Sequence, residues 1–101
     1  MKDNEIKLYS EVLTSWGIHD QLDMAIEECS ELINAICKLR RGRATEADVV
    51  TEVADVMIMC EQLTIHFGEV NVNAEKEFKL KRLKDRLTKW KQKHKLDDAR
   101  L

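Results

Sequence analysis

Apolar residues recur at three- and four-residue steps along most of the chain, which is the spacing of one face of an α-helix. These steps predict a first helix over residues 4–15, ending before Gly17, and a second over residues 19–40, ending before Gly42. The sequence contains no proline, the residue that most often breaks or kinks a helix, and this favours long helices. No strand-like alternation persists, and we expect an all-α protein.

Two further helices are expected in the second half of the chain. The third follows Thr45, which with Asp48 has the pattern of a capping box with Asp in place of Glu, and it ends near Gly68. The fourth begins near Asn73, a good N-cap, and ends at about Lys93.

The four helices fit one small domain. A chain of 101 residues allows a single domain, which we expect over residues 1–95, with residues 96–101 fraying as a C-terminal tail. A chain this short buries only about two thirds of its unfolded surface. We therefore expect an antiparallel, four-helix bundle-like subunit whose core is completed by oligomerisation. A narrow seam suited to packing runs along the fourth helix and consists of Leu80, Leu83, Leu87 and Trp90.

Composition excludes several classes of protein. With 44% hydrophobic and 36% charged residues, the chain is too apolar for disorder and too charged for a membrane span. Its first residues lack the apolar segment of a secretory signal. Cys29, Cys37 and Cys60 show no paired spacing, and an odd count of this kind predicts reduced, buried thiols in a cytoplasmic protein.

The net charge of −2 hides a strong segregation of charge along the chain. Residues 1–37 carry −6, residues 38–43 carry +4, residues 44–74 carry −6 and residues 75–95 carry +7. Separate acidic and basic blocks can hold a cation and an anion together, although charge runs more often form solvated faces.

Four of the acids form two pairs with i, i+3 spacing: Glu28 with Glu31, and Glu52 with Asp55. Residues three apart project from the same side of a helix. If the second and third helices pack antiparallel, which their short connection favours, the two pairs face each other. Together they would form an oxygen-rich site suited to Mg²⁺ or Mn²⁺.

Glu52 is the acid that fits a solvated face least well. Met59 and Leu63 lie only about 20° from it around the helix, so Glu52 sits inside an apolar stripe. A buried carboxylate is costly unless it is paired, protonated or bound to metal. An ion pair with Arg or Lys of the fourth helix would satisfy Glu52 as well as a metal would, so the residues alone leave both interpretations open.

An all-carboxylate magnesium site indicates phosphate chemistry, in which the ion contacts phosphate oxygens. A di-iron site is disfavoured, because no histidine has an acid three positions before it. A Walker-type enzyme is disfavoured too, because the chain has no glycine-rich phosphate loop. Basic residues that could neutralise phosphates are Lys38, Arg41, Lys79, Arg82 and Arg86.

These motifs together resemble the MazG-like, all-α nucleoside triphosphate pyrophosphohydrolases. The hallmark of that family is E-E-x-x-E on one helix and E-x-x-D on the next, and both occur here in order, as Glu27-Glu28-x-x-Glu31 and Glu52-x-x-Asp55. The resemblance covers about residues 12–88 and is greatest to small, single-domain, phage-type members. It also includes Trp16-Gly17, Gln21, Arg41-Gly42 and the segment 78–87.

The resemblance implies Mg²⁺-dependent hydrolysis of a (deoxy)nucleoside triphosphate to the monophosphate and pyrophosphate, with Mn²⁺ as a substitute. It implies a homo-oligomer, dimer or tetramer, in the cytoplasm (of the host, for a phage-encoded protein). The implied metal ligands are Glu28, Glu31, Glu52 and Asp55. Glu27 would be a nearby catalytic acid of the motif, which either supports the ligands or assists the attacking water. The helical periodicity directs Glu27 outward, to the polar side of the helix near Lys38. Contacts to the triphosphate would come from Lys38, Lys79 and Arg82.

Trp16 and Gln21, near the start of the second helix, are candidates for base recognition. An indole can stack on a base, and a carboxamide offers both a donor and an acceptor to its edge. Trp16 also fits a core position between the first two helices, and Gln21 fits an ordinary polar residue of a first helical turn.

A second function class stays open on the sequence alone. The chain could be a non-enzymatic helical module that binds nucleic acid or a protein through its basic fourth helix, which carries ten Lys and Arg between residues 75 and 95. That interpretation leaves Glu52 unexplained, and a thermal response to Mg²⁺ or Mn²⁺ would separate the two.

Overall fold

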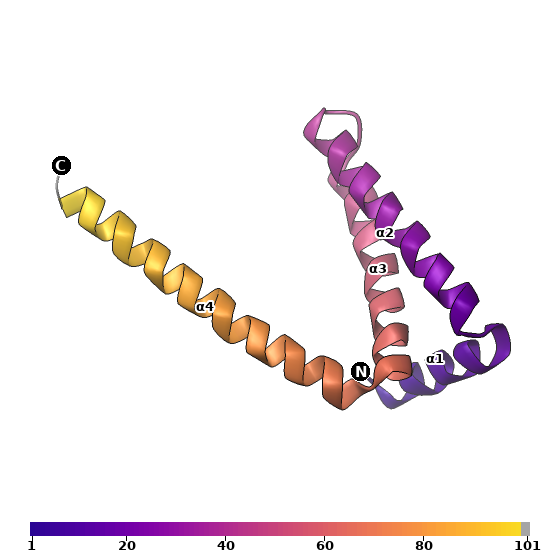
Figure 1. The fold of residues 1–101 in the computed structure, drawn as a ribbon. Helices are drawn as coiled ribbons and strands as arrows, with labels where there is room; N and C mark the ends of the chain where they lie inside the picture. The colour runs from indigo at the N-terminus through magenta and orange to yellow at the C-terminus, as the bar shows by residue number, and fades with distance from the viewer. Residues whose placement is uncertain (100–101) are drawn as a thin grey trace. The chain divides into compact units, whose positions relative to one another are not determined.

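The computed structural model describes residues 1–99, with side chains to residue 95, and these residues form four helices and no strand (Figure 1). Helix α1 covers Asp3–Trp16, α2 covers Ile18–Arg40, α3 covers Glu46–Phe67 and α4 covers Glu69–Ala99. The predicted all-α class is confirmed.

The boundaries of the first three helices lie close to the predicted ones. Gly17 and Gly42 adopt φ values of 86° and 71°, which only glycine reaches without strain, and so separate the helices. The capping box forms as predicted: the Asp48 backbone N–H donates to Thr45 Oγ1 at 3.3 Å, and the Thr45 N–H donates to Asp48 Oδ2 at 2.8 Å. Such a cap stabilises a helix by about 1 kcal/mol.

Helix α4 is longer than predicted. It begins at Glu69, before the expected N-cap Asn73, because Gly68 alone, at φ 107°, separates it from α3. It continues through Ala99, beyond the expected end at Lys93, since no proline or glycine stops it. Residues 96–99 of the tail that is expected to fray belong to this helix, and residues 100 and 101 lie outside the described residues.

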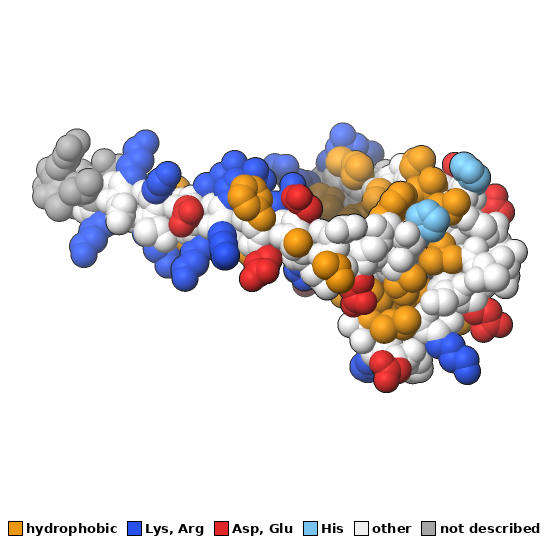
Figure 2. Space-filling model, turned by 60° about the horizontal axis from the view of Figure 1, so that its bottom comes forward, with side chains coloured by type: hydrophobic (Ala, Val, Ile, Leu, Met, Phe, Trp, Pro, Cys, Tyr) orange, Lys and Arg blue, Asp and Glu red, His pale blue; other side chains and the backbone are white. Residues whose placement is uncertain are grey.

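Residues 1–68 and the helix α4 are two separate units and are described individually. By itself, α4 is a basic helix whose Lys and Arg side chains project from opposite sides (Figure 2). Its apolar seam is about half exposed, with 49% of Leu87 and 55% of Trp90 accessible. The bundle-like closure and the oligomeric core stay predictions.

In the first unit, α2 and α3 run antiparallel side by side, and α1 packs across them near one end (Figure 1). The core is thin: its buried apolar residues are Tyr9, Ala25, Ala35 and Met59, and no side chain of the described residues is completely enclosed. The Tyr9 hydroxyl donates to Glu61 Oε2 at 3.1 Å and so ties α1 to α3. Burial, and then the nearby Glu61 carboxylate, raise the pKa of Tyr9.

Two burial expectations are wrong for this unit. Residues 49–67 are apolar almost all round the helix and so predict a central, buried helix. Helix α3 is not surrounded, since Val50 is 67% and Met57 57% exposed. Cys29, Cys37 and Cys60 are free thiols, as predicted, but they are exposed. Both results have one cause. Helices α2 and α3 pack on each other and on α1 through one face each, and the other apolar face of each has no partner within residues 1–68.

Among the residues that the model describes, no helix combines the length and the apolar character needed to cross a membrane.

Candidate functional site

The side of α2 that packs on α3 is a line of residues in seven-residue steps. Gln21 and Ala35 are 3% and 8% exposed, and Glu28 lies midway between them on the same line. The sequence places the apolar stripe of this helix elsewhere, on residues such as Ile26 and Ile33, but these are 67% and 63% exposed. Glu28 therefore faces α3 more directly than the periodicity of α2 suggests.

Helix α3 presents a matching line. Glu52 precedes buried Met59 by seven residues, and Asp55 precedes buried Gln62 by seven. The register between the helices is fixed by a buried hydrogen bond of 2.6 Å from Gln21 Nε2 to Gln62 Oε1. Because the helices are antiparallel, residues that follow Gln21 on α2 lie opposite residues that precede Gln62 on α3. The two pairs of acids therefore face each other.

Glu28, Glu31 and Glu52 form the carboxylate cluster. One oxygen of each side chain lies within 4.8 Å of the others. Glu28 and Glu52 are half-buried, and the Oε2 atom of each is enclosed without a hydrogen-bond partner among the described residues. An enclosed carboxylate oxygen with no partner is unfavourable, so this arrangement has an unmet need for a proton or a cation.

The electrostatics of the cluster agree with its geometry. Burial raises the pKa of Glu28, and the charges of Glu31, Asp55 and Glu52 raise it further, in that order. Burial likewise raises the pKa of Glu52, followed by the charges of Glu31 and Asp55. Asp55, which is half-buried, is thus close enough to act on both acids, although it is not one of the three whose oxygens converge.

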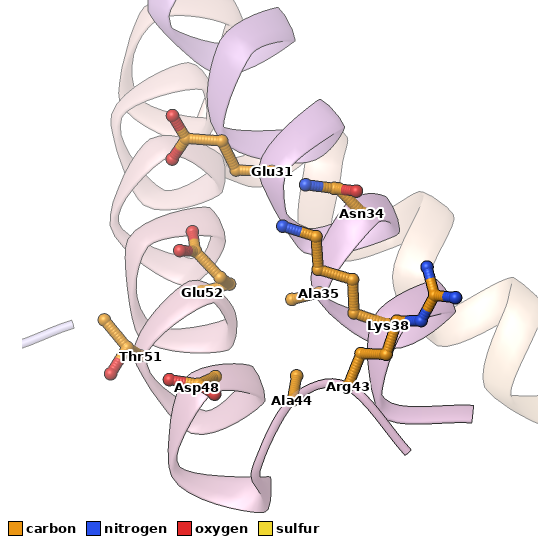
Figure 3. Close-up of a pocket in the computed structure, with 9 residues that line it drawn as sticks. All are labelled: Glu31, Asn34, Ala35, Lys38, Arg43, Ala44, Asp48, Thr51 and Glu52. Atoms are coloured by element: carbon orange, nitrogen blue, oxygen red, sulfur yellow. The ribbon is translucent and has the colours of Figure 1, made fainter. Parts of the chain in front are cut away.

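A cavity of about 380 Å³ opens beside the cluster, between α2 and α3 near the loop that joins them (Figure 3). The side chain of Lys38 extends along α2 toward Glu31 and Glu52 (Figure 3). The full lining is Glu31, Asn34, Ala35, Lys38, Arg43, Ala44, Asp48, Thr51 and Glu52. The cavity therefore combines carboxylates at one end with ammonium, guanidinium and carboxamide groups, a donor set suited to an anion held next to a cation.

The remaining predicted site residues fall into two groups. Glu27 is exposed and does not belong to the cluster, in agreement with its expected outward direction. Lys79 and Arg82 lie on α4, and their contacts to a triphosphate stay a prediction.

Trp16 and Gln21, the candidates for base recognition, both line a second cavity, which has a volume of about 510 Å³. The interpretation of Trp16 as a core residue is wrong for this unit, because its side chain is 64% exposed. Gln21, in contrast, is 3% exposed and is far from an ordinary polar residue of a first turn.

Sequence reasoning missed Asn34, Arg43, Asp48 and Gln62. The sequence indicates Asp48 only as a capping residue, and it also lines the first cavity. Arg43 is adjacent to the Arg41-Gly42 turn, and Gln62 is in line with Asp55 at a seven-residue step, so heptad spacing could have found Gln62. No local signal marks Asn34.

No family model matches the chain, and no significant match exists among the curated proteins or the solved structures.

The raised pKa values make the stability of the metal-free protein depend on pH. A folded state that holds protons more tightly than the unfolded chain is stabilised at low pH, and this contribution is lost as pH rises through the raised values of Glu28 and Glu52. We expect the free energy of unfolding in EDTA, measured by urea denaturation, to fall as pH rises above the ordinary glutamate value of 4.5.

Glu52→Gln should flatten this slope and should stabilise the metal-free protein at neutral pH. Glu46→Gln, an exposed acid on the same helix, is the control that keeps the slope. Asp48 has the opposite effect on stability, since hydrogen bonds from Thr45 lower its pKa. That contribution changes only at pH values below its ordinary pKa of 3.8, outside the range of this measurement. If the free energy of unfolding had the same pH dependence in Glu52→Gln as in the parent protein, a raised pKa of Glu52 would be contradicted.

Proposed function

We propose that the protein is a Mg²⁺-dependent nucleoside triphosphate pyrophosphohydrolase of the MazG-like type, which acts on cytoplasmic nucleotides as a homo-oligomer. One observation carries the proposal: three carboxylates from two helices converge. In two of them, one oxygen is enclosed and has no hydrogen-bond partner within the described part of the chain. The E-E-x-x-E and E-x-x-D motifs of the sequence supply those residues.

The residues fit a hard divalent cation. Mg²⁺ and Mn²⁺ prefer carboxylate oxygens, and Glu28, Glu31 and Glu52 offer only such atoms at the cluster. Asp55 adds a fourth negative charge nearby, as its influence on the pKa of Glu28 and Glu52 indicates. When bound, the ion would supply Lewis-acid polarisation of a phosphate oxygen.

The other residues of the first cavity suit the triphosphate. Lys38 and Arg43 present positive charge to this cavity, with the Lys38 side chain pointing toward the acids, and Asn34 presents a carboxamide (Figure 3). In the proposed reaction, water adds to the α-phosphorus and the bond from this phosphorus to the α–β bridging oxygen breaks. Lys38 and Arg43 would then stabilise the charge that develops on the departing pyrophosphate.

The proton of that water needs an acceptor other than the carboxylates that would hold the cation, because a carboxylate that binds a cation is a weaker base. The exposed Glu27 lies one residue before Glu28 and is the further acid that the motif suggests for this role.

The thin core of residues 1–68 supports the oligomer. Ile26, Ile33 and Val50 are each 63–67% exposed, and this much apolar surface on a small domain is typical of an interface.

The proposal is tested by a screen of the full-length protein against the canonical and modified (d)NTPs with Mg²⁺. We expect equal amounts of monophosphate and pyrophosphate from at least one of them, and no product in EDTA. Orthophosphate and a diphosphate as the products would indicate a different bond cleavage, and no turnover of any triphosphate would refute the proposal.

The non-enzymatic interaction module is the second candidate function, and the exposed basic surface of α4 favours it (Figure 2). Lys and Arg on every side of one helix suit a polyanion without specifying one face. This function gives no reason for carboxylates to converge between α2 and α3, which is why we place it second.

A further inference from the structure

The second cavity lies about two turns from the carboxylate cluster and differs from it in chemistry. It is formed by the start of α2, the later part of α3 and the end of α1. Its lining is Trp16, Asp20, Gln21, Asp23, Met24, Met59 and Gln62, and its volume is about 510 Å³. An exposed indole and two thioethers give it apolar walls, which suit a flat, polarisable ring.

Two buried carboxamides supply the polar groups of this cavity. Gln21 and Gln62 are 3% and 5% exposed, and one hydrogen bond from Gln21 Nε2 to Gln62 Oε1 holds them in a fixed relative position. Gln21 Oε1 and Gln62 Nε2 have no partner among the described residues and are not among the completely enclosed atoms. The pair therefore presents a free acceptor beside a free donor, or the reverse if both amides are turned.

The charge of the rim limits which end of a ligand can enter. Asp20 and Asp23 are exposed carboxylates that would repel a phosphate. They can accept hydrogen bonds from hydroxyl or amino groups. The cavity thus suits the uncharged end of a ligand whose anionic end lies elsewhere.

We propose that this cavity binds a nucleobase, whose donor–acceptor edge is read by the Gln21–Gln62 pair while Trp16 contacts its face. Gln21 and Glu28 are separated by about 10 Å along α2, which is a length that the sugar and phosphates of a nucleotide can span. Gln62, on α3, thereby becomes a specificity-determining residue. The inference rests on the proposed function for the anionic end of the ligand, but its test requires no hydrolysis.

The test is a nuclear magnetic resonance titration of the full-length protein with the four deoxynucleosides, which carry no phosphate. We expect at least one to shift the Trp16 indole N–H, the side-chain amides of Gln21 and Gln62 and the methyl groups of Met24 and Met59. The same nucleoside methylated on its hydrogen-bonding edge should bind at least tenfold more weakly. Absence of these shifts for all four, or equal binding of the methylated form, would overturn the proposal.

Two variants separate recognition from folding. Replacing one member of the buried pair would leave the other unpaired, so Gln21→Met and Gln62→Met are made together, which can be nearly neutral for stability. The double variant should fold and lose nucleoside binding at least tenfold. Trp16→Ala, at an exposed position, should weaken binding about 5- to 100-fold, while Trp90→Ala on α4 should not. Retention of affinity in both cavity variants would overturn the proposal.

A parallel hydrolysis assay keeps this inference distinct from the proposed function. Turnover of a nucleoside triphosphate without any nucleoside shifts would support the function and overturn the base site. Nucleoside shifts in a protein that hydrolyses no triphosphate would support the base site and refute the function.

Discussion

Glu52→Gln is expected to lower kcat/KM for pyrophosphate release by about 10²–10³-fold. The substitution keeps the size of the side chain and removes one negative charge from the cluster of Glu28, Glu31 and Glu52. Stabilisation of transition-state charge by a metal contributes several kcal/mol, and each 1.4 kcal/mol corresponds to a tenfold change in rate. The loss should appear in kcat, measured at saturating substrate and Mg²⁺, because charge development is stabilised most in the transition state.

Two properties of the variant make this result informative. First, the helix content of Glu52→Gln by circular dichroism should equal that of the parent protein. Second, its metal-free stability at neutral pH should rise, because Glu52 is a half-buried acid with a raised pKa. A variant that is more stable and yet inactive has lost chemistry and kept its fold.

Matched controls complete the experiment. Asp55→Asn tests the fourth motif acid and should also lower the rate strongly. Glu46→Gln, the same chemical change at an exposed position of α3, should leave kcat/KM within about twofold, as surface substitutions usually have small effects. Full activity of both Glu52→Gln and Asp55→Asn would show that these carboxylates are not ligands of a catalytic metal.

The approach of the acids to one another is the feature that the sequence predicts best. Two i, i+3 pairs on helices with a short connection face each other if the helices are antiparallel, and Glu28, Glu31 and Glu52 do converge. The reason is local: the positions of acids on a helix are set by spacing, and a five-residue connection between Arg40 and Glu46 leaves the chain little choice of direction.

The packing face of α2 could not be predicted in the same way. Hydrophobicity alone selects the line of Ile26 and Ile33, whereas the buried line contains Gln21, a polar residue, and the small Ala25 and Ala35. Small residues allow close approach of two helices, and a buried carboxamide is tolerated only because Gln62 is placed to accept its hydrogen bond. That partner is 41 residues away in sequence, so periodicity within one helix cannot reveal it.

The length of α4 depends on a similarly non-local fact. Asn73 is a good N-cap when a helix begins there, but the helix begins earlier, and Asn73 lies in its interior. A cap residue predicts a boundary only if the preceding residues are not helical. Here the residues from Glu69 to Val72 already form the first turn of α4.

Mg²⁺ or Mn²⁺ is expected to raise the melting temperature of the EDTA-treated protein by about 10 °C or more at a hundredfold excess over Kd. Binding to the folded state alone contributes about 2.7 kcal/mol at this excess, and 1 kcal/mol shifts the melting temperature of a domain of this size by about 4–8 °C. The physical reason is that a cation would supply the partner that Glu28 Oε2 and Glu52 Oε2 lack among the described residues.

The melting experiment must report on residues 1–68, because α4 is a separate unit. A Trp90→Phe background leaves Trp16 as the sole tryptophan and makes its fluorescence a probe of α1, α2 and α3. Na⁺ at equal ionic strength should give a much smaller shift, and Glu52→Gln should lose most of the response to Mg²⁺. A non-enzymatic module acting through α4 predicts the same shift with either salt, and that result would favour it over the enzyme.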